Sequence, residues 1–467
     1  MISLSFLLLL LLNLVLIKTE LKFVYEVFRH GARSPWAPGN KGINETRQDI
    51  YGEYWFNSLP GLESELTSMG MRQHYLLGYK MRSKYVDTGF LDKSFNMSQL
   101  LIFSTNINRT ILSAQSQLFG IYPPGTGNQI FANQSILAIP PGNPIPDLDK
   151  ILTELQNNSL LFGGQVFPVH LFEEKYEALF LPSRCPPFAD ELKKNEKNEE
   201  ILAYIKEFNA TYYEKLQKVL GFKDKNYLTI PDNLLVISDT YVANYFEGRK
   251  LLSLVNAGID LDEFYKQTKT YLRLNMLKNF GDKELKMAKV TVSKILAVLI
   301  DNLDWVVEME NKGKDADWTK RQKFLMHSMH DTNLYALLTL FNETLKTGVL
   351  EYSQFASNMI FEFEKPTTNK TEKYVNSDFN LTITYNDRLI YSSTYDKFRD
   401  IINPQLMSNE QIDNFCNLTP GEDHLLYIII IIVLSVVVII QLIAIIFVVR
   451  KRQSQTSEEE SLQGITA

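Results

Sequence analysis

The chain has 467 residues, of which 22% are charged and 12% are aromatic, and its net charge is −6. This length supports a large core in one big domain with an insertion, or in two domains. The negative balance argues against nucleic acid as the main partner, because nucleic-acid-binding domains carry a basic surface. It also makes a local cluster of arginines informative, since such a cluster does not follow from the bulk composition.

Both ends of the chain carry long apolar segments. Residues 4–17 are too short for a comfortable membrane span, and they indicate a signal peptide that we place at residues 1–19. Residues 425–449 are long and apolar enough to cross a bilayer, and an Arg-Lys-Arg triplet follows directly. We therefore expect a type I membrane protein in a lysosomal or endosomal membrane or at the cell surface. Its catalytic part would be lumenal or extracellular, and residues 450–467 would form a cytoplasmic tail.

Glycosylation signals and cysteine usage agree with a secreted ectodomain. Asn-x-Ser/Thr sequons are dense along the chain, as expected of a glycoprotein. The two cysteines, Cys185 and Cys416, are most simply one long-range disulfide, and two buried free thiols are the alternative. Their spacing excludes a cysteine-based zinc site.

The most informative stretch follows the first strand. Leu21–Phe28 is apolar enough to be a buried strand, and it runs directly into Arg29-His30-Gly31-x-Arg33-x-Pro35. Ligands bind outside the carboxyl ends of strands in open α/β sheets, and guanidinium groups suit phosphate oxygens. The stretch therefore predicts a phosphate site centred on His30, although an Arg-His pair after a strand can also be an exposed turn. Residues 37–61 are expected to form a loop that overhangs this site.

A second strand and helix repeat this arrangement. Leu62–Val86 is expected to be a helix with a cap at Thr67 or Ser68, and we interpret its His74 as structural. Leu100–Ser104 then reads as a strand that leads to Arg109 at the start of a helix. A cation there opposes the helix dipole, which is unexplained unless an anion binds nearby. The alternative is an ordinary solvated arginine. Asn108 is formally a sequon, and we expect it to be unmodified because a glycan would crowd the site.

The middle of the chain changes character. Residues 181–314 are expected to form a helical cap inserted into the sheet domain. The expected helices are Glu191–Leu220, Tyr241–Ala257, Asp262–Phe280 and Lys283–Glu310.

After this insertion the strand pattern returns. Arg321–Ser328 is expected to be a strand that ends at adjacent His330 and Asp331, with a helix from Leu334. His327 lies within this strand and is expected to be part of the core. The remaining strands are expected at Tyr352–Glu364 and Asp378–Tyr391. The α/β core would therefore be discontinuous, comprising residues 20–180 and 315–420.

Taken together, these motifs resemble the histidine acid phosphatases, in particular the lysosomal and prostatic group. Phe28–Pro35 is similar to the RHGxRxP signature of that family, and His330-Asp331 resembles its HD motif. Leu66–Gly78 resembles the helix after the signature, and Ser104–Thr110 resembles the segment with the family's third arginine. The resemblance covers most of residues 21–419 and is weak in the helical insertion.

The resemblance implies a phosphoglycerate-mutase-like α/β core with an α-helical cap, and a disulfide between Cys185 and Cys416. It also implies that His30 is the nucleophile that becomes phosphohistidine and that Asp331 is the general acid. The groups that hold the phosphoryl oxygens would be Arg29, Arg33, Arg109 and His330.

Such a site performs its chemistry without a metal or another cofactor, because the arginines neutralise the phosphoryl charge. The expected substrate is a phosphate monoester, split in two displacements through a covalent histidine intermediate. A carboxylic acid is protonated only in acid, so we expect an acidic activity optimum.

Alternative functions are a phytase or inositol-polyphosphate phosphatase on the same fold, and a surface receptor whose catalytic core has been retired. The complete set of site residues favours an enzyme over the receptor. The oligomeric state stays open, with a homodimer as one option.

Overall fold

The strands expected around the Arg-His stretch form the middle of a seven-stranded mixed sheet. The computed structural model describes residues 19–36, 64–131, 134, 137–142, 144–172, 185–367, 372–417, 429–446 and 448. Within these residues the strand order is β3-β2-β4-β1-β5-β6-β7. The strands are β1 (Thr19–Arg29), β2 (Leu100–Ser104), β3 (His170–Leu171), β4 (Phe324–Met329), β5 (Asn358–Pro366), β6 (Asn380–Tyr385) and β7 (Arg388–Thr394).

The direction of the strands decides where side chains meet. β1, β2 and β3 lie in one parallel block with β4, so that Arg29 is opposite Met329 and Ser104 is opposite Ser328. β5 then runs antiparallel to β1, and β6 and β7 continue as antiparallel neighbours. Because β1, β2 and β4 are parallel, their carboxyl ends meet at one edge of the sheet.

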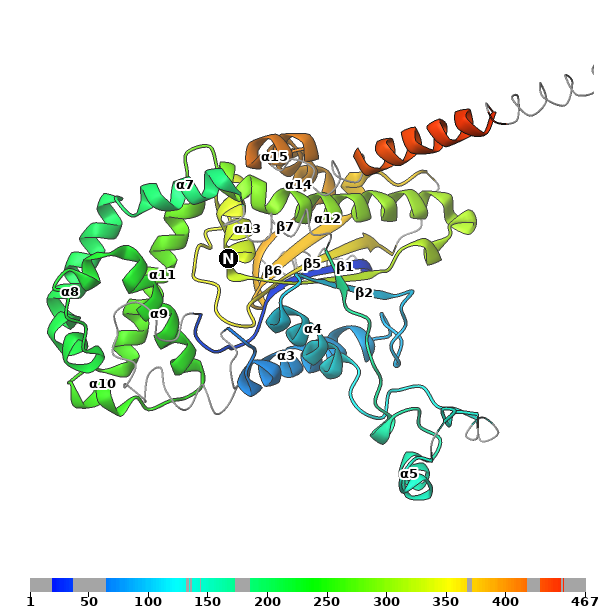
Figure 1. Ribbon diagram of the computed structural model, residues 1–467, viewed down its shortest axis with the longest axis horizontal. Helices are drawn as coiled ribbons and strands as arrows, with labels where there is room; N and C mark the ends of the chain where they lie inside the picture. Colours follow the sequence, from blue (N-terminus) through cyan, green and yellow to red (C-terminus); the bar gives the residue numbers. More distant parts are fainter. Residues whose placement is uncertain are drawn as a thin grey trace, which may run out of the picture. The chain divides into compact units, whose positions relative to one another are not determined.

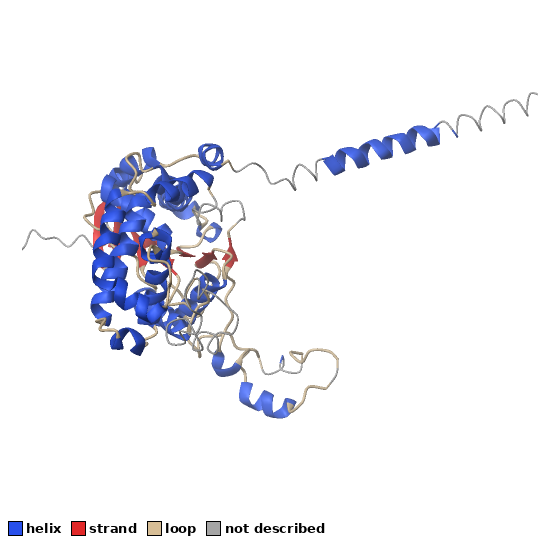
Figure 2. Ribbon diagram, turned by 60° about the vertical axis from the view of Figure 1, so that its left-hand side comes forward, coloured by secondary structure: helices blue, strands red, loops and turns tan. Residues whose placement is uncertain are grey.

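Helices cover both faces of this sheet, as Figures 1 and 2 show. α3 (Ser68–Met81) packs on α4 (Asn108–Ile121) on one face, where α4 contacts β2 and β4. α12 (Lys286–Lys312) and α13 (Asp331–Thr344) contact each other and β1 on the other face. Burial on both faces explains why β1 and β4 read as continuous apolar runs rather than alternating ones.

The remaining helices are mostly in the predicted insertion. They are α5 (Leu148–Leu155), α7 (Pro186–Asn195), α8 (Glu199–Leu220), α9 (Pro231–Phe246), α10 (Leu252–Asn256), α11 (Leu261–Phe280), α14 (Tyr395–Ile402) and α15 (Asn409–Cys416). Aromatic and aliphatic side chains of α8, α9 and α11 form a separate core cluster. α12, which lies inside the range given to the insertion, packs on the sheet instead. The exact limits of the cap remain a prediction.

Several expected boundaries needed correction. The expected helix Glu191–Leu220 is two helices, because Asn198 begins α8 as an N-cap whose side chain accepts from the backbone N–H groups of Glu200 and Ile201. The expected helix Tyr241–Ala257 is also two helices. α9 begins ten residues earlier, at Pro231, a residue favoured in the first helical turn, and ends at Phe246, and α10 covers Leu252–Asn256. The expected strand Val166–Leu171 is reduced to the two residues of β3.

The end of the chain forms a second unit, residues 409–467, distinct from residues 1–408. Among the described residues, Ile429–Ile446 is the one helix that is long and apolar enough to cross a membrane, with a mean hydropathy of 3.5. Both cysteines are disulfide-bonded, which agrees with the expected bridge. The signal peptide, the loop at residues 37–61 and the cytoplasmic tail lie outside the described residues.

Candidate active site

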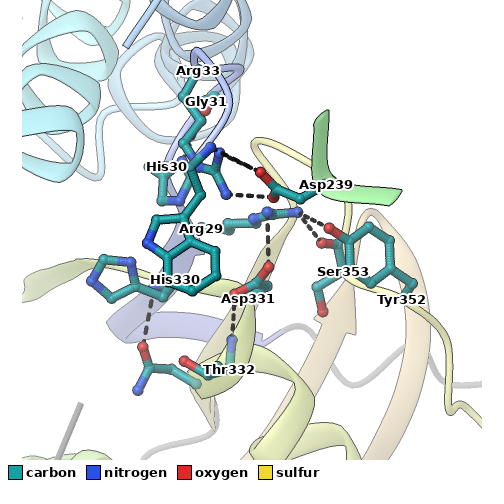
Figure 3. A network of polar contacts seen from close by, with 12 residues as sticks. Arg29, His30, Gly31, Arg33, Asp239, His330, Asp331, Thr332, Tyr352 and Ser353 are labelled. Atoms are coloured by element: carbon teal, nitrogen blue, oxygen red, sulfur yellow. Dashed lines mark hydrogen bonds and ion pairs between the residues drawn. The ribbon is translucent and has the colours of Figure 1, made fainter. Parts of the chain in front are cut away.

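The predicted phosphate-binding residues come together at the carboxyl edge of β1, β2 and β4. Arg29 is the last residue of β1, Arg109 lies in the first turn of α4, and Asp331 is the first residue of α13. Figure 3 shows the side chains of His30, Arg33 and His330 gathered around Arg29. The sheet topology therefore unites residues from three distant parts of the sequence in one site.

His30 lies at the centre of this arrangement. Its side chain is buried, and its ring is 5.6 Å from that of His330 between ring centroids. The Nδ1 atom is 2.9 Å from the carbonyl oxygen of Gly31, so Nδ1 carries the proton and donates to that carbonyl. This hydrogen bond leaves the lone pair on Nε2. Burial lowers the pKa of His30 well below its ordinary value, and the charges of Arg109, Arg29 and Arg33 lower it further. His30 is therefore a neutral imidazole with a free Nε2 lone pair.

Arg29 is held from several sides. One of its terminal nitrogens, Nη1, donates to the hydroxyl of Tyr352 at 3.1 Å and to the carbonyl of Ser353 at 2.6 Å. The other, Nη2, is 2.8 Å from Oδ2 of Asp331. The ring of Phe355 lies 4.3 Å from the guanidinium carbon, a cation–π distance. Burial opposes the charge on Arg29, but Asp331 and Tyr352 outweigh it, so the pKa of Arg29 is raised.

Arg33 pairs with a carboxylate that sequence reasoning did not find. Asp239 of α9 accepts from Arg33 through both oxygens, at 2.7 and 3.1 Å, and it also accepts from the backbone N–H of Trp36. Burial raises the pKa of Asp239, and Arg33 outweighs that effect and leaves the pKa below its ordinary value. The contacts of Asp239 with Arg33 and Trp36 thus connect α9 to the Arg-His loop. No local motif surrounds it in the sequence, and only the fold brings it to Arg33.

Arg109 completes the positive cluster. Burial and the proximity of Arg33 lower the pKa of Arg109 to about 10, so it remains charged at neutral pH. Its Nε atom is buried and has no hydrogen-bond partner among the described residues, and the same is true of Nε in Arg29 and Arg33. Unpaired buried donors carry a large desolvation penalty. Three of them on guanidinium groups around one histidine indicate an anion-binding site.

His330 and Asp331 occupy the start of α13. Nε2 of His330 is 3.0 Å from the hydroxyl of Thr105, and its backbone N–H donates to Oδ1 of Asn333. α13 begins at Asp331 rather than at the expected Leu334, because Asn333 caps the helix from inside its first turn. Asp331 therefore lies in the first turn of α13, with its side chain next to Arg29.

The Arg-His loop rests closely on α3. A Cβ atom on Gly31 would lie 2.7 Å from Cα of Gly70, so only glycine permits this approach. The backbone N–H of Gly31 donates to Ser113, and that of Ala32 donates to Gln73. His74, expected to be structural, is fully buried, and its Nε2 lies 3.1 Å from the carbonyl oxygen of Arg29. His74 thus holds the backbone of the loop at Arg29.

His327 is buried in the core as expected, where Nδ1 contacts the hydroxyl of Tyr25.

Within the described part of the chain, no group of three or more His, Cys, Asp or Glu side chains is arranged to hold a metal ion. The site is instead an arginine cradle around two histidines with one nearby carboxylate. A cradle of this composition on a mixed α/β sheet defines a phosphate-handling class of protein.

Comparison with known proteins names the family. Residues 20–380 match the histidine phosphatase superfamily (branch 2), and the chain belongs to this family. This membership is consistent with a phosphoric monoester hydrolase. The expected resemblance to histidine acid phosphatases is thereby confirmed.

Curated relatives are acid phosphatases. The lysosomal acid phosphatase of Xenopus laevis is 26% identical over 359 residues, covering 74% of this chain and 66% of that protein. The prostatic acid phosphatase of Homo sapiens is 29% identical over 347 residues, covering 72% of this chain and 73% of that protein. The matches thus span about two thirds to three quarters of these relatives.

Solved structures support the fold. The apo form of Hafnia alvei phytase superposes with a TM-score of 0.52 at 11% identity, covering 83% of this chain and 97% of that one. This likeness confirms the expected α/β architecture flanked by helices.

Proposed function

We propose that this chain hydrolyses phosphate monoesters through a phosphohistidine intermediate on His30. The observation that carries the proposal is the buried, neutral His30, whose free Nε2 lies among three guanidinium groups with unpaired Nε donors. A phosphoryl group needs neutralised oxygens and an unprotonated nucleophile, and this cluster supplies both.

The first displacement forms a bond between phosphorus and Nε2 of His30 and breaks the bond between phosphorus and the leaving oxygen. Arg29, Arg33, Arg109 and His330 hold the phosphoryl oxygens. Asp331 donates its proton to the departing alkoxide, which leaves as an alcohol. The hydrogen bond from Nδ1 to the carbonyl of Gly31 stabilises the ring as Nε2 gives up its electron pair.

The second displacement reverses these roles. Water attacks the phosphohistidine, the Asp331 carboxylate accepts a proton from that water, and the P–N bond breaks to release inorganic phosphate. His30 returns to its neutral form, and Asp331 is again protonated for the next cycle.

The test is hydrolysis of p-nitrophenyl phosphate by the chain and by His30→Ala, scanned across pH. We expect an acidic optimum for the wild type and a loss of about 10³-fold or more in the variant. A brief reaction with ³²P-labelled substrate, stopped by denaturation at alkaline pH, should label the wild type but not His30→Ala. Folded wild type that turns over neither this substrate nor phytate would contradict the proposal and favour the receptor alternative.

We also propose that the helix Ile429–Ile446 anchors the chain in a membrane with the catalytic part lumenal or extracellular. The helix is apolar apart from Ser435 and Gln441, and the Arg-Lys-Arg triplet follows it in sequence. The chain should remain in the pellet after alkaline carbonate extraction, and protease added outside sealed vesicles should remove only the tail. Release of the intact chain by carbonate would contradict this arrangement.

A further inference from the structure

A chain of buried, hydrogen-bonded side chains ends at the backbone of the catalytic loop. It runs from Glu26 on β1 through Gln117 on α4 and His74 on α3 to the carbonyl oxygen of Arg29. Nε2 of Gln117 is 2.7 Å from Oε2 of Glu26, and Oε1 of Gln117 is 2.9 Å from Nδ1 of His74. Nε2 of His74 is 3.1 Å from the Arg29 carbonyl oxygen. All three side chains are fully buried, and the proposed reaction does not use them.

The two helices are built to bring this chain together. A Cβ atom on Gly78 would collide with the backbone carbonyl of Gln117, and one on Gly120 would collide with that of Tyr75. Only glycine at both positions allows α3 and α4 to approach this closely. The approach lets His74 of one helix meet Gln117 of the other.

The contacts restrict where the protons are. In the amide orientation given above, Oε1 of Gln117 and the Arg29 carbonyl oxygen face the two ring nitrogens of His74. Both nitrogens must then carry a proton, so His74 is an imidazolium. Glu26, which accepts from Nε2 of Gln117, is then a carboxylate. Turning the amide by 180° satisfies the same contacts without charge. Glu26 then donates to Oε1 of Gln117, Nε2 of Gln117 donates to Nδ1 of His74, and Nε2–H of His74 donates to the Arg29 carbonyl. Both arrangements hold the same two protons and the same net charge.

The surroundings favour the neutral arrangement. Burial raises the pKa of Glu26 to about 8, against the hydrogen bonds from Asn358 and Gln117 and the charge of Lys80. Burial also lowers the pKa of His74 to about 4, against its hydrogen bonds to Gln117 and Arg29. The second oxygen of Glu26 accepts from Nδ2 of Asn358 at 2.8 Å, which suits a carboxylic acid as well as a carboxylate. The charge of Lys80 and the contact of Nε2 of Gln117 with the sulfur of Met81 at 3.1 Å favour the charged form instead.

We propose that Glu26, as a neutral acid, orients Gln117 and His74 as positioning residues that fix the Arg29–His30 peptide. This inference rests on the proposed role of His30. The Arg29 carbonyl belongs to the peptide that carries the His30 N–H, and that N–H donates to Met329 at 3.0 Å. The peptide plane is thus held on one side by β4 and on the other by His74. Fixing this plane aims Nε2 of His30 at phosphorus, where small displacements are costly.

The decisive variant is Glu26→Gln, made in the full chain in detergent. A glutamine amide reproduces the neutral acid, because it can donate to Gln117 and accept from Asn358. We expect kcat on p-nitrophenyl phosphate within about threefold of wild type and an undiminished thermal midpoint. If Glu26 were a carboxylate paired with an imidazolium, this variant would leave a buried charge unpaired. Loss of activity and of stability in Glu26→Gln would therefore overturn the proposal.

Gln117→Leu should break the chain, and Gln115→Leu is its matched control. Gln115 lies on the same helix and donates one hydrogen bond, to the carbonyl of Phe167, away from His74. We expect Gln117→Leu to lower kcat at least tenfold with little change in KM, and Gln115→Leu to leave both unchanged. Equal effects of the two variants would show a merely structural role and overturn the proposal.

The ¹⁵N chemical shifts of His74 give a readout independent of turnover. In histidine-labelled protein we expect a neutral Nε2–H tautomer in wild type and in Glu26→Gln, assigned by the signals missing from His74→Gln. Imidazolium shifts at neutral pH would overturn the proposal. Because this readout does not use His30, the hydrogen-bonded chain and the proposed catalysis can fail separately.

Discussion

Buried Arg29 and half-buried Asp331 form an ion pair, with Nη2 and Oδ2 2.8 Å apart. The pair joins a proposed phosphate ligand to the proposed general acid. A substrate phosphate that binds Arg29 competes with this carboxylate and places a negative charge beside it. Phosphate binding at Arg29 and the position of the Asp331 carboxylate are therefore coupled.

Replacement of Asp331 by asparagine should affect substrates according to their leaving groups. p-Nitrophenolate is a weak base and leaves without being protonated, whereas an alkoxide is a strong base and must be protonated as it leaves. We expect Asp331→Asn to lower kcat on an alkyl phosphate such as glycerol phosphate by about 10²–10⁴-fold and on p-nitrophenyl phosphate much less. Steady-state kinetics on both substrates checks this. Equal losses on the two would show that Asp331 acts on binding rather than on proton transfer.

Arg109 should contribute mainly to anion binding. Its side chain is half-buried, and its Nε is buried and unpartnered among the described residues. We expect Arg109→Gln to weaken competitive inhibition by inorganic phosphate about 10–100-fold, because charge-assisted hydrogen bonds are each worth about 1.5–3 kcal/mol. The matched control is Arg72→Gln on the exposed side of α3, which should leave the inhibition constant unchanged. An unchanged constant in Arg109→Gln would place that arginine outside the site.

The same variant should shift the pH profile. Burial and then the charge of Arg109 lower the pKa of His30, so the nucleophile stays unprotonated well below the ordinary histidine pKa of about 6.5. Removing the Arg109 charge raises the pKa of His30, and acid then protonates the nucleophile sooner. We expect the acid limb of kcat/KM to move to higher pH in Arg109→Gln. A limb that stays in place or moves to lower pH would contradict the neutral-imidazole assignment.

Glu26 should make stability depend on pH in the direction opposite to ordinary carboxylates. Its pKa is raised to about 8 in the folded chain, mainly by burial, and is about 4.3 in the unfolded chain. The proton therefore stabilises the fold fully below about pH 4.3, and this contribution is lost as the pH rises toward 8. The glutamine in Glu26→Gln does not titrate, so the stability of this variant lacks this pH-dependent contribution. Its thermal midpoint, relative to wild type, should rise by a few degrees between pH 5 and pH 8. A constant difference would contradict the raised pKa.

Asn108 should carry no glycan despite its sequon. Its Nδ2 donates to Oε1 of Glu65 at 3.2 Å, and Arg109 follows directly in the site. A glycan there would compete with the substrate for space. Mass spectrometry of protein expressed through the secretory pathway should find Asn108 unmodified, with the exposed Asn157 as the comparison sequon. A modified Asn108 in active protein would move Arg109 away from the phosphate.

The sequence by itself determined the local elements that present the chemistry. Continuous apolar runs specify β1 and β4 as strands buried on both faces, and these end where Arg29 and His330 begin their loops. Thr67 caps α3 as expected, because a threonine side chain satisfies a free backbone donor at a helix start. Such features depend on neighbours in sequence and are therefore readable from it. The Arg-His and His-Asp motifs, read with the strand ends, predicted a candidate site at these positions.

Only the tertiary structure decided which side chains from distant parts of the sequence complete the candidate site. Asp239 reaches Arg33 from α9, and Tyr352 and Phe355 enclose Arg29 from the segment before β5. None carries a local motif, since their contacts depend on how α9 and the sheet edge pack against each other. Glu26 reads from the sequence as an ordinary strand residue. Its burial against Gln117 follows from the close approach of α3 and α4, a relationship between elements that no single stretch of the chain encodes.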